Sequence, residues 1–201
     1  SLVASAKVKS TFAKYAKVRN SQGFTGAQAA QRVLERAGIY DVRIEHVSGN
    51  LTDHYGPKSK VLRLSDSVYG QSTVAAVGVA AHECGHAIQH AQGYAPLVMR
   101  SALVPVVNFA SSIVQWVLLA GVIFFYTFPG LLWIGIALFA MTTLFSFITL
   151  PVEINASVRA ISWLEGAGVT DCQTRPMAID ALKWAAYTYV IAALGSLATL
   201  L

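Results

Sequence analysis

The first part of the chain alternates hydrophobic and polar residues with the period of an α-helix. Residues 6–19 have one mainly apolar face, and several lysines lie on the other faces. A basic amphipathic helix of this kind suits a membrane surface, and a solvated charged helix fits the pattern nearly as well. The run Thr25-Gly26-Ala27-Gln28 fits a capping box, and Gly38 is typical of the residue that follows a helix. The pattern therefore predicts two helices before residue 39.

The period changes to two between residues 39 and 64, as expected for β-strands. Residues 40–47 alternate, and two short runs rich in strand-forming residues follow at 51–55 and 60–64. The segment between these two runs reads Gly-Pro-Lys-Ser, which is a turn sequence. We therefore predict a small sheet, which either offers an edge strand to an extended substrate or caps the neighbouring helices.

Residues 73–91 return to the helical period, and Gly93 and Pro96 are expected to end this helix. Its first half is apolar on all sides, so we expect it to be buried. The small residues of this half permit close approach of a neighbouring helix.

Long apolar stretches dominate the second half of the chain. Two are expected to form helices at about 102–126 and 130–150, and a third covers the tail from residue 184 to residue 201. The sequence Leu150-Pro151-Val152-Glu153 is typical of a new helix with proline in its first turn. Polar residues inside the first stretch, such as Asn108 and Gln115, are expected to face a packing partner.

Composition turns these stretches into candidate membrane spans. The hydrophobic fraction is 55%, the charged fraction is 12%, and the mean hydropathy is +0.52. An ordinary soluble domain has about twice that charge. Residues 101–152 contain no charged residue, which is long enough for two membrane crossings of about 20 residues each. The sequence therefore predicts an integral membrane protein.

The formal net charge of +5 does not indicate a nucleic-acid partner, because no aromatic-basic module accompanies it. The basic residues instead mark topology: Arg100 and Arg159 flank the apolar hairpin, and its turn at 127–130 has no Lys or Arg. The positive-inside rule then places the polar part on the cytoplasmic side. The two cysteines, Cys84 and Cys172, imply no disulfide framework and suit a reducing compartment.

The strongest chemical signal is the motif His82-Glu83-Cys84-Gly85-His86, which reads H-E-x-x-H on the predicted helix 73–91. Positions four apart lie on one face of a helix, so His82 and His86 can present two imidazoles to one metal ion. Two satisfied core histidines are the alternative, but the charged Glu83 would then need a buried partner of its own. The motif therefore predicts a zinc hydrolase with Glu83 as general base. We expect Cys84 to be a packing residue and His90 to lie outside the ligand set.

A catalytic zinc ion usually has three protein ligands and one water, and no histidine follows His90. A two-span hairpin returns the chain to the side it left, which favours Glu153, the first charged residue after the apolar block. The alternative for Glu153 is a carboxylate that complements the dipole of a helix first turn. We predict one Zn²⁺ per chain, bound by His82, His86 and Glu153. The remaining candidates are Glu165, Asp171 and Asp180.

Four segments of the chain resemble the YugP family of neutral zinc metallopeptidases of bacterial membranes: 51–55, 79–90, 94–97 and 150–153. The similarity covers nearly the whole chain. It implies a multi-pass protein of the bacterial inner membrane, and the positive-inside rule puts its active site on the cytoplasmic side. It also implies a further membrane helix before Ser1 and a final membrane helix that this chain contains in part.

The layout is also similar to HtpX-type membrane proteases, in which a hairpin separates H-E-x-x-H from a ligating glutamate. That similarity implies a gluzincin-like, mainly helical α+β fold. Residues 1–100 would form the cytoplasmic catalytic part with a small sheet, 101–150 a transmembrane helical hairpin, and 151–201 the third-ligand helix and a C-terminal apolar helix. Many gluzincins have Asp one turn after the ligating Glu, where this chain has Ser157, so the usual supporting carboxylate must come from elsewhere or be absent.

The expected reaction is hydrolysis of a protein or peptide substrate at the lipid bilayer. Glu83 would take a proton from water and deliver it to the leaving amine. Candidates for stabilising the developing oxyanion are His54, Tyr69, Arg159, Tyr187 and Tyr189. Two other functions remain open: a site-2-type intramembrane protease, which would use a distant Asp as third ligand, and a non-catalytic zinc-binding scaffold, which would not need Glu83.

Overall fold

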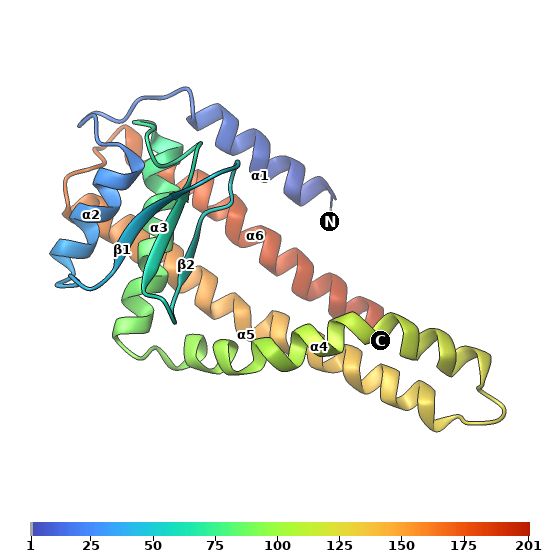
Figure 1. Ribbon diagram of the computed structural model, residues 1–201. Coiled ribbons are helices and arrows are strands. Elements are labelled where there is room, and N and C mark those ends of the chain that lie inside the picture. The colour runs from blue at the N-terminus through green and yellow to red at the C-terminus, as the bar shows by residue number, and fades with distance from the viewer. Residues whose placement is uncertain (1) are drawn as a thin grey trace. The chain divides into compact units, whose positions relative to one another are not determined.

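The structure is a computed structural model that describes residues 2–201 (Figure 1). Most of the chain is helical, and three short strands precede the third helix. The elements are α1 (Leu2–Tyr15), α2 (Gly26–Arg36), β1 (Arg43–Val47), β2 (His54–Gly56), β3 (Val61–Ser65), α3 (Val74–Ala91), α4 (Ala95–Ile123), α5 (Gly130–Gly166) and α6 (Thr174–Leu200). They form two compact units, residues 2–94 with Val152–Thr188 and Ala95–Pro151 with Tyr189–Leu201.

The predicted small sheet is present in the first unit. Its strand order is β1-β3-β2, with β1 parallel to β3 and β2 antiparallel to it. The central strand β3 is the most buried, with Val61, Leu62 and Leu64 at most 1% exposed. Helices α2 and α3 pack against the sheet, and β2 is an edge strand in contact with α3 (Figure 1).

The boundaries of α2 follow from its sequence as predicted. Thr25 Oγ1 accepts a hydrogen bond from the backbone N–H of Gln28, and Gln28 Oε1 accepts one from the backbone N–H of Thr25. These two bonds satisfy donors that a helix N-terminus otherwise leaves unpaired. At the other end, Gly38 has a φ of +74°, the left-handed conformation that favours glycine after a helix.

Helix α3 is the central element of the first unit, because two apolar clusters meet on it. One cluster joins α3 to α1, α5 and α6 through residues such as Val77, Ala81 and Leu164. The other joins α3 to α2 and β3 through residues such as Ala80, Cys84 and Leu62. The prediction that the first half of this helix is buried is confirmed, and Cys84 packs in the core as expected.

Helix α5 differs from the prediction. A new helix was expected to begin at Leu150-Pro151, but α5 runs without interruption from Gly130 to Gly166 with Pro151 inside it. Proline removes one backbone hydrogen bond from a helix. Beyond Pro151, buried Val152, Ala156 and Ala160 pack α5 into the first unit, and this tertiary contact maintains the helix where local sequence favours a break.

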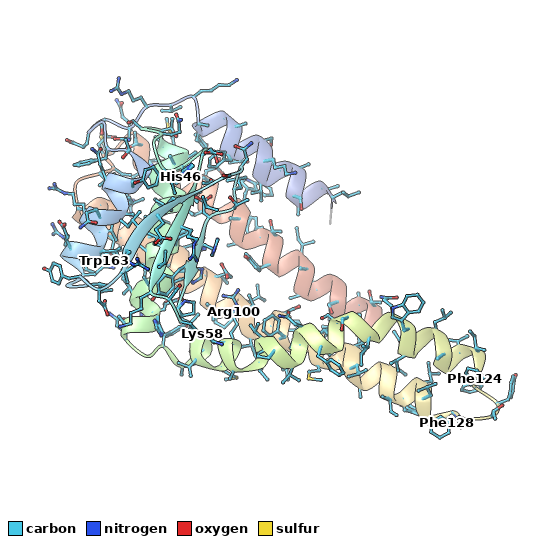
Figure 2. The ribbon with its side chains drawn as sticks, viewed as in Figure 1. His46, Lys58, Arg100, Phe124, Phe128 and Trp163 are labelled. Atoms are coloured by element: carbon cyan, nitrogen blue, oxygen red, sulfur yellow. The ribbon has the colours of Figure 1, made fainter. Side chains whose placement is uncertain are left out.

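The second unit contains a hairpin of α4 and the first part of α5. Three helices, α4, α5 and α6, are long and apolar enough to cross a membrane. Many of their large apolar side chains are exposed, including Trp116 at 72% and Trp133 at 71%. Phe124 and Phe128 lie at the turn between α4 and α5 (Figure 2). An apolar surface of this kind is what hydrocarbon contact requires. Asn108 and Gln115 are exposed, so the expected packing partner is not found among the described residues.

Candidate metal centre

One face of α3 presents a row of polar side chains to the C-terminal part of α5. His82, His86 and Gln89 follow one another at intervals of four and three residues, which keeps them on one face of the helix. On α5, Glu153 and Ser157 are four residues apart, and both contact this row. The crossing of the two helices thereby brings together side chains that are more than 60 residues apart in the sequence.

The spacing of the three predicted ligands fits a zinc ion. Glu153 Oε2 lies 3.1 Å from His82 Nε2 and 3.6 Å from His86 Nε2, and the three donor atoms all lie within 4.8 Å of one another. Zinc bonds of about 2.0–2.1 Å in tetrahedral geometry place ligand atoms about 3.3 Å apart. The side chain of Glu153 is only 3% exposed, and burial of a carboxylate is costly unless it has partners, which here include His82 and His86.

The other ring nitrogens of both histidines are held by neighbours. His82 Nδ1 lies 3.1 Å from Ser157 Oγ, and His86 Nδ1 lies 3.1 Å from Gln89 Oε1. Such partners orient a metal-binding imidazole and leave its other nitrogen available. Ser157 therefore contacts His82 from the position, one turn after Glu153, where many gluzincins have Asp.

A glycine allows the two helices to approach closely at this point. A Cβ atom on Gly85 would lie 2.7 Å from the carbonyl oxygen of Ala156 and 3.1 Å from its Cα. Real side chains do not tolerate such contacts with backbone atoms. Gly85 thus lets α5 lie against the motif helix between the two histidines.

Glu83 belongs to the same turn of α3 and is partly buried. Its burial raises the pKa of the carboxyl group, nearby His82 and His86 lower it, and the negative charges of Glu153 and Asp53 raise it again, with a net increase. Asp53 is itself fixed by Ser65, whose backbone N–H and hydroxyl donate to it at 2.7 and 2.9 Å. For His86, burial lowers the pKa of the imidazole, but its contact with Glu153 and the charge of Glu83 outweigh that effect and raise it.

Comparison with known sequences also indicates a zinc peptidase. The family described as "Putative neutral zinc metallopeptidase" matches residues 1–201. The chain belongs to this family. Its sequence is also 46% identical over 195 residues to a Bacillus subtilis (strain 168) protein named "Putative membrane protease YugP", covering 97% of this chain and 86% of that protein. No solved structure matches the chain.

Arg159, predicted as a possible oxyanion partner, is on α5 and contacts Gln92, the C-cap residue of α3. Its Nε donates to Asn155 Oδ1 at 2.7 Å, and its Nη1 donates to Gln92 Oε1. Its guanidinium carbon is 5.8 Å from the ring centre of Tyr94. The guanidinium group is therefore engaged by three neighbours, and one of them, Asn155, also contacts Gln89.

The other predicted oxyanion partners are dispersed. His54 is exposed on β2, with its Nδ1 bonded to the carbonyl of Thr52 at 2.9 Å. Tyr69 lies edge-on against His46, and Tyr187 lies edge-on against Trp184 on α6. Tyr189 falls in the second unit. His54, Tyr69 and Tyr187 make their contacts at different places in the first unit, and the catalytic role of all four side chains stays a prediction.

His90 was expected to lie outside the ligand set, and its ring nitrogen Nδ1 lies 3.0 Å from the hydroxyl of Tyr55 on β2. This contact joins the end of α3 to the edge strand. It places His90 in a structural link between the sheet and the motif helix.

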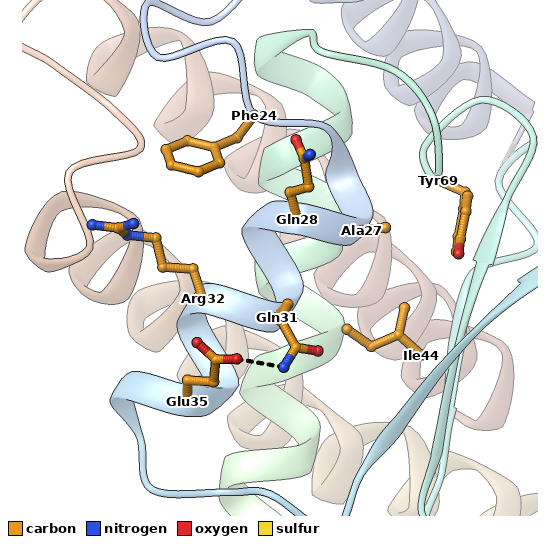
Figure 3. A pocket seen from close by; sticks show the side chains of 8 residues that line it. All are labelled: Phe24, Ala27, Gln28, Gln31, Arg32, Glu35, Ile44 and Tyr69. Atoms are coloured by element: carbon orange, nitrogen blue, oxygen red, sulfur yellow. Dashed lines mark hydrogen bonds between the residues drawn. The ribbon is translucent and has the colours of Figure 1, made fainter.

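A separate groove of about 470 Å³ lies along α2 (Figure 3). It is lined by Phe24, Ala27, Gln28, Gln31, Arg32, Glu35, Ile44 and Tyr69. Gln31 donates to Glu35 at 2.6 Å, and the guanidinium group of Arg32 lies over the ring of Phe24 and donates to the carbonyl of Ala167. Gln31, Glu35 and Arg32 thus already have partners, and the predicted zinc ligands do not line the groove.

Sequence reasoning missed Gln89 and Asn155. Gln89 is fully buried, and its amide contacts His86, the backbone carbonyl of Val152 and Asn155. Its position three residues after His86 was a usable signal, since that spacing places both side chains on one helix face. Asn155 could not be identified in this way, because its role depends on the rotation of α5 against α3.

Proposed function

We propose that the chain is a membrane-embedded zinc metalloprotease that binds one zinc ion through His82, His86 and Glu153. The observation that carries this proposal is the convergence of two imidazole nitrogens and one buried carboxylate at the spacing of a tetrahedral ligand set. Membership of a zinc metallopeptidase family and three helices suited to a membrane support it. Three protein ligands leave one coordination position for water, as in catalytic zinc sites.

The chemistry is divided between the metal and Glu83. Bound zinc would lower the pKa of a water molecule and polarise the scissile carbonyl. Glu83 lies beside both histidines on α3, and we assign it the role of general base that takes the proton from water. The same carboxyl group then gives the proton to the leaving amine. The partial burial of Glu83 limits its contact with bulk water that would compete for this proton.

An extended peptide could bind along β2. This strand pairs with β3 on one side only, so its other edge presents unpaired backbone groups. Strand β2 contacts α3 and follows Asp53, which is close enough to Glu83 to affect its pKa. Addition of the substrate as a further strand would satisfy the edge and align its backbone beside the motif helix.

The proposal includes a gluzincin-like site at the cytoplasmic face of the bacterial inner membrane. The catalytic part would be residues 1–100, followed by a transmembrane hairpin at 101–150 and by the third-ligand helix and a C-terminal membrane helix at 151–201. Support comes from the basic residues that flank the apolar hairpin and from the position of Glu153 in the same unit as α3.

Two other functions are weaker on specific grounds. A site-2-type protease would have H-E-x-x-H in a membrane span and a distant Asp as third ligand. Here the carboxylate beside the histidines is Glu153, and the motif helix lies in a unit that also contains a sheet. A non-catalytic zinc scaffold needs the three ligands but gains nothing from Glu83 in a partly buried position.

The test is to measure zinc content and cleavage of fluorescein-labelled casein with detergent-purified protein. We expect Glu83→Gln to retain zinc and lose activity by about 10²-fold or more, and Glu153→Ala to lose both. The control is Glu165→Gln, on the same helix as Glu153 but 57% exposed and paired with Arg175, which should retain both. Retained activity in Glu83→Gln would exclude Glu83 as the base, and wild-type zinc content in Glu153→Ala would exclude the proposed ligand set.

A further inference from the structure

A continuous chain of hydrogen bonds leads from Arg159 and Asn155 on α5 to Gln89 and His86 on α3. Arg159 Nε donates to Asn155 Oδ1 at 2.7 Å, and Gln89 Nε2 donates to the same oxygen at 2.9 Å. Gln89 Oε1 then lies 3.1 Å from His86 Nδ1. These hydrogen bonds therefore connect the half-buried Arg159 with a predicted metal ligand.

The direction of each hydrogen bond follows from groups that can only donate or only accept. Arginine has donors and no acceptor, so the Asn155 atom that faces Arg159 must be the carbonyl oxygen. The Gln89 atom that faces the same oxygen must then be the amide nitrogen. The backbone carbonyl of Val152, 2.9 Å from this nitrogen, requires the same orientation. Both constraints turn the carbonyl oxygen of Gln89 toward His86.

This orientation determines where the proton of a neutral His86 lies. A carbonyl oxygen only accepts, so Nδ1 of His86 must carry the hydrogen, and Nε2 keeps its lone pair. Nε2 is also the atom that faces Glu153, at 3.6 Å. These hydrogen bonds thus select the neutral tautomer in which Nε2 of His86 can bind a metal ion next to Glu153.

The anchor of the chain is held independently of the metal centre. Arg159 also donates to Gln92, the C-cap residue of α3, and lies over the ring of Tyr94. A cation at this place also interacts favourably with the C-terminal end of a helix. By contrast, His82 Nδ1 contacts the hydroxyl of Ser157, which can donate or accept and imposes no direction.

We propose that Arg159, Asn155 and Gln89 act as positioning residues that hold His86 in its metal-binding tautomer. This rests on the proposed function, because it assigns a purpose to His86 as a zinc ligand. None of the three residues needs to touch the metal or the substrate. The role of Arg159 is then the support of a ligand, in place of contact with an oxyanion.

The test measures the zinc dissociation constant of the full detergent-purified chain by competition with a chromophoric chelator. We expect Gln89→Met and Asn155→Leu to weaken zinc binding by about 10- to 100-fold, as is typical for partners of ligating histidines. Arg159→Met should weaken it less. Asn155→Asp keeps an acceptor for both Gln89 and Arg159 and should stay within about threefold of wild type. The matched control Gln31→Met removes an exposed amide on α2 and should have no effect.

Cobalt substitution separates positioning from folding. The visible absorption of bound Co²⁺ reports ligand geometry, so we expect altered spectra in Gln89→Met and Asn155→Leu and a wild-type spectrum in Asn155→Asp. Thermal unfolding of the metal-free proteins identifies variants that fail to fold. If Gln89→Met fails to fold, the test rests on Asn155→Leu, Asn155→Asp and Arg159→Met.

The outcomes distinguish this proposal from the proposed function. Wild-type zinc affinity and cobalt spectra in folded Gln89→Met, Asn155→Leu and Arg159→Met would overturn the positioning role of these residues and leave the proposed zinc protease intact. Equal losses in Asn155→Asp and Asn155→Leu would also overturn it, because the hydrogen bonds from Gln89 and Arg159 require only an acceptor at position 155. A wild-type protein that binds no zinc would overturn the zinc protease itself.

Discussion

Helix α5 makes a close glycine-mediated contact in each of the two units, and the two contacts serve different ends. In the first unit, Gly85 of α3 faces the backbone of Ala156, where a Cβ would lie 2.7 Å from its oxygen. In the second unit, Gly121 of α4 faces the backbone of Leu132, where a Cβ would lie 2.7 Å from its Cα. Both glycines let two helices approach more closely than any side chain allows.

The surroundings of the two contacts differ in polarity. Around Gly85 lie the predicted zinc ligands and the hydrogen bonds of Ser157 and Gln89. Around Gly121 and Gly135 the neighbours are leucines, Leu132 and Leu118. The same packing device therefore positions chemistry in one unit and only joins two apolar helices in the other. Disturbing each glycine should separate these roles.

The largest effect is expected from Gly85→Ala. The added methyl group meets backbone atoms of Ala156, so α3 and α5 must move apart by a few tenths of an ångström or more. Overpacking of this kind destabilises by about 1–3 kcal/mol, and the same movement separates Glu153 from the histidines. We expect loss of most bound zinc, measured by elemental analysis, together with a lower unfolding temperature.

Gly78→Ala provides the control on the same helix. A Cβ at Gly78 meets nothing within 4 Å, so the substitution should retain zinc and stabilise α3 by up to about 1 kcal/mol through helix propensity. A Gly85→Ala protein that keeps stoichiometric zinc would show that the ligand set does not depend on this close approach.

Much of the first unit could be predicted from local sequence because its signals are local. The capping box at Thr25, the left-handed Gly38 and the turn before β3 are determined by residues that are neighbours in the chain. The convergence of His82, His86 and Glu153 was also predictable, since helical spacing and the return of a hairpin need no knowledge of packing. Whether they bind metal stays a prediction.

Features that depend on how two helices pack were beyond local sequence. The proline at position 151 suggested a helix boundary, but buried Val152 and Ala156 continue α5 through it. The hydrogen bonds through Asn155 depend on how α5 is rotated against α3, because Asn155 shares only part of the helix face that carries Glu153 and Ser157. No spacing rule in one helix gives the rotation of another.

A smaller effect is expected in the second unit from Gly121→Ala. Its methyl group would meet the backbone of Leu132, and we expect a destabilisation of about 1–3 kcal/mol, measured by thermal unfolding in detergent. Gly135→Ala should be milder, because the atom it meets at 2.7 Å is the flexible end of Leu118. Both variants should retain full zinc content. Zinc loss in either would contradict the separation of roles between the two contacts.

The smallest effect is expected from Thr143→Val, which also tests a polar contact in the second unit. Thr143 Oγ1 lies 2.6 Å from Ser196 Oγ and so joins α5 to α6, while the same hydroxyl also contacts the carbonyl of Phe139 within its own helix. Hydrogen bonds between membrane helices are worth on average about 0.6 kcal/mol, and valine preserves the shape of threonine. We expect a small decrease in unfolding temperature without loss of zinc or cleavage, and the same decrease in Ser196→Ala. Because one bond joins the two hydroxyls, the double variant should lose little more than either single variant, and additive losses would show that the two residues act through separate contacts.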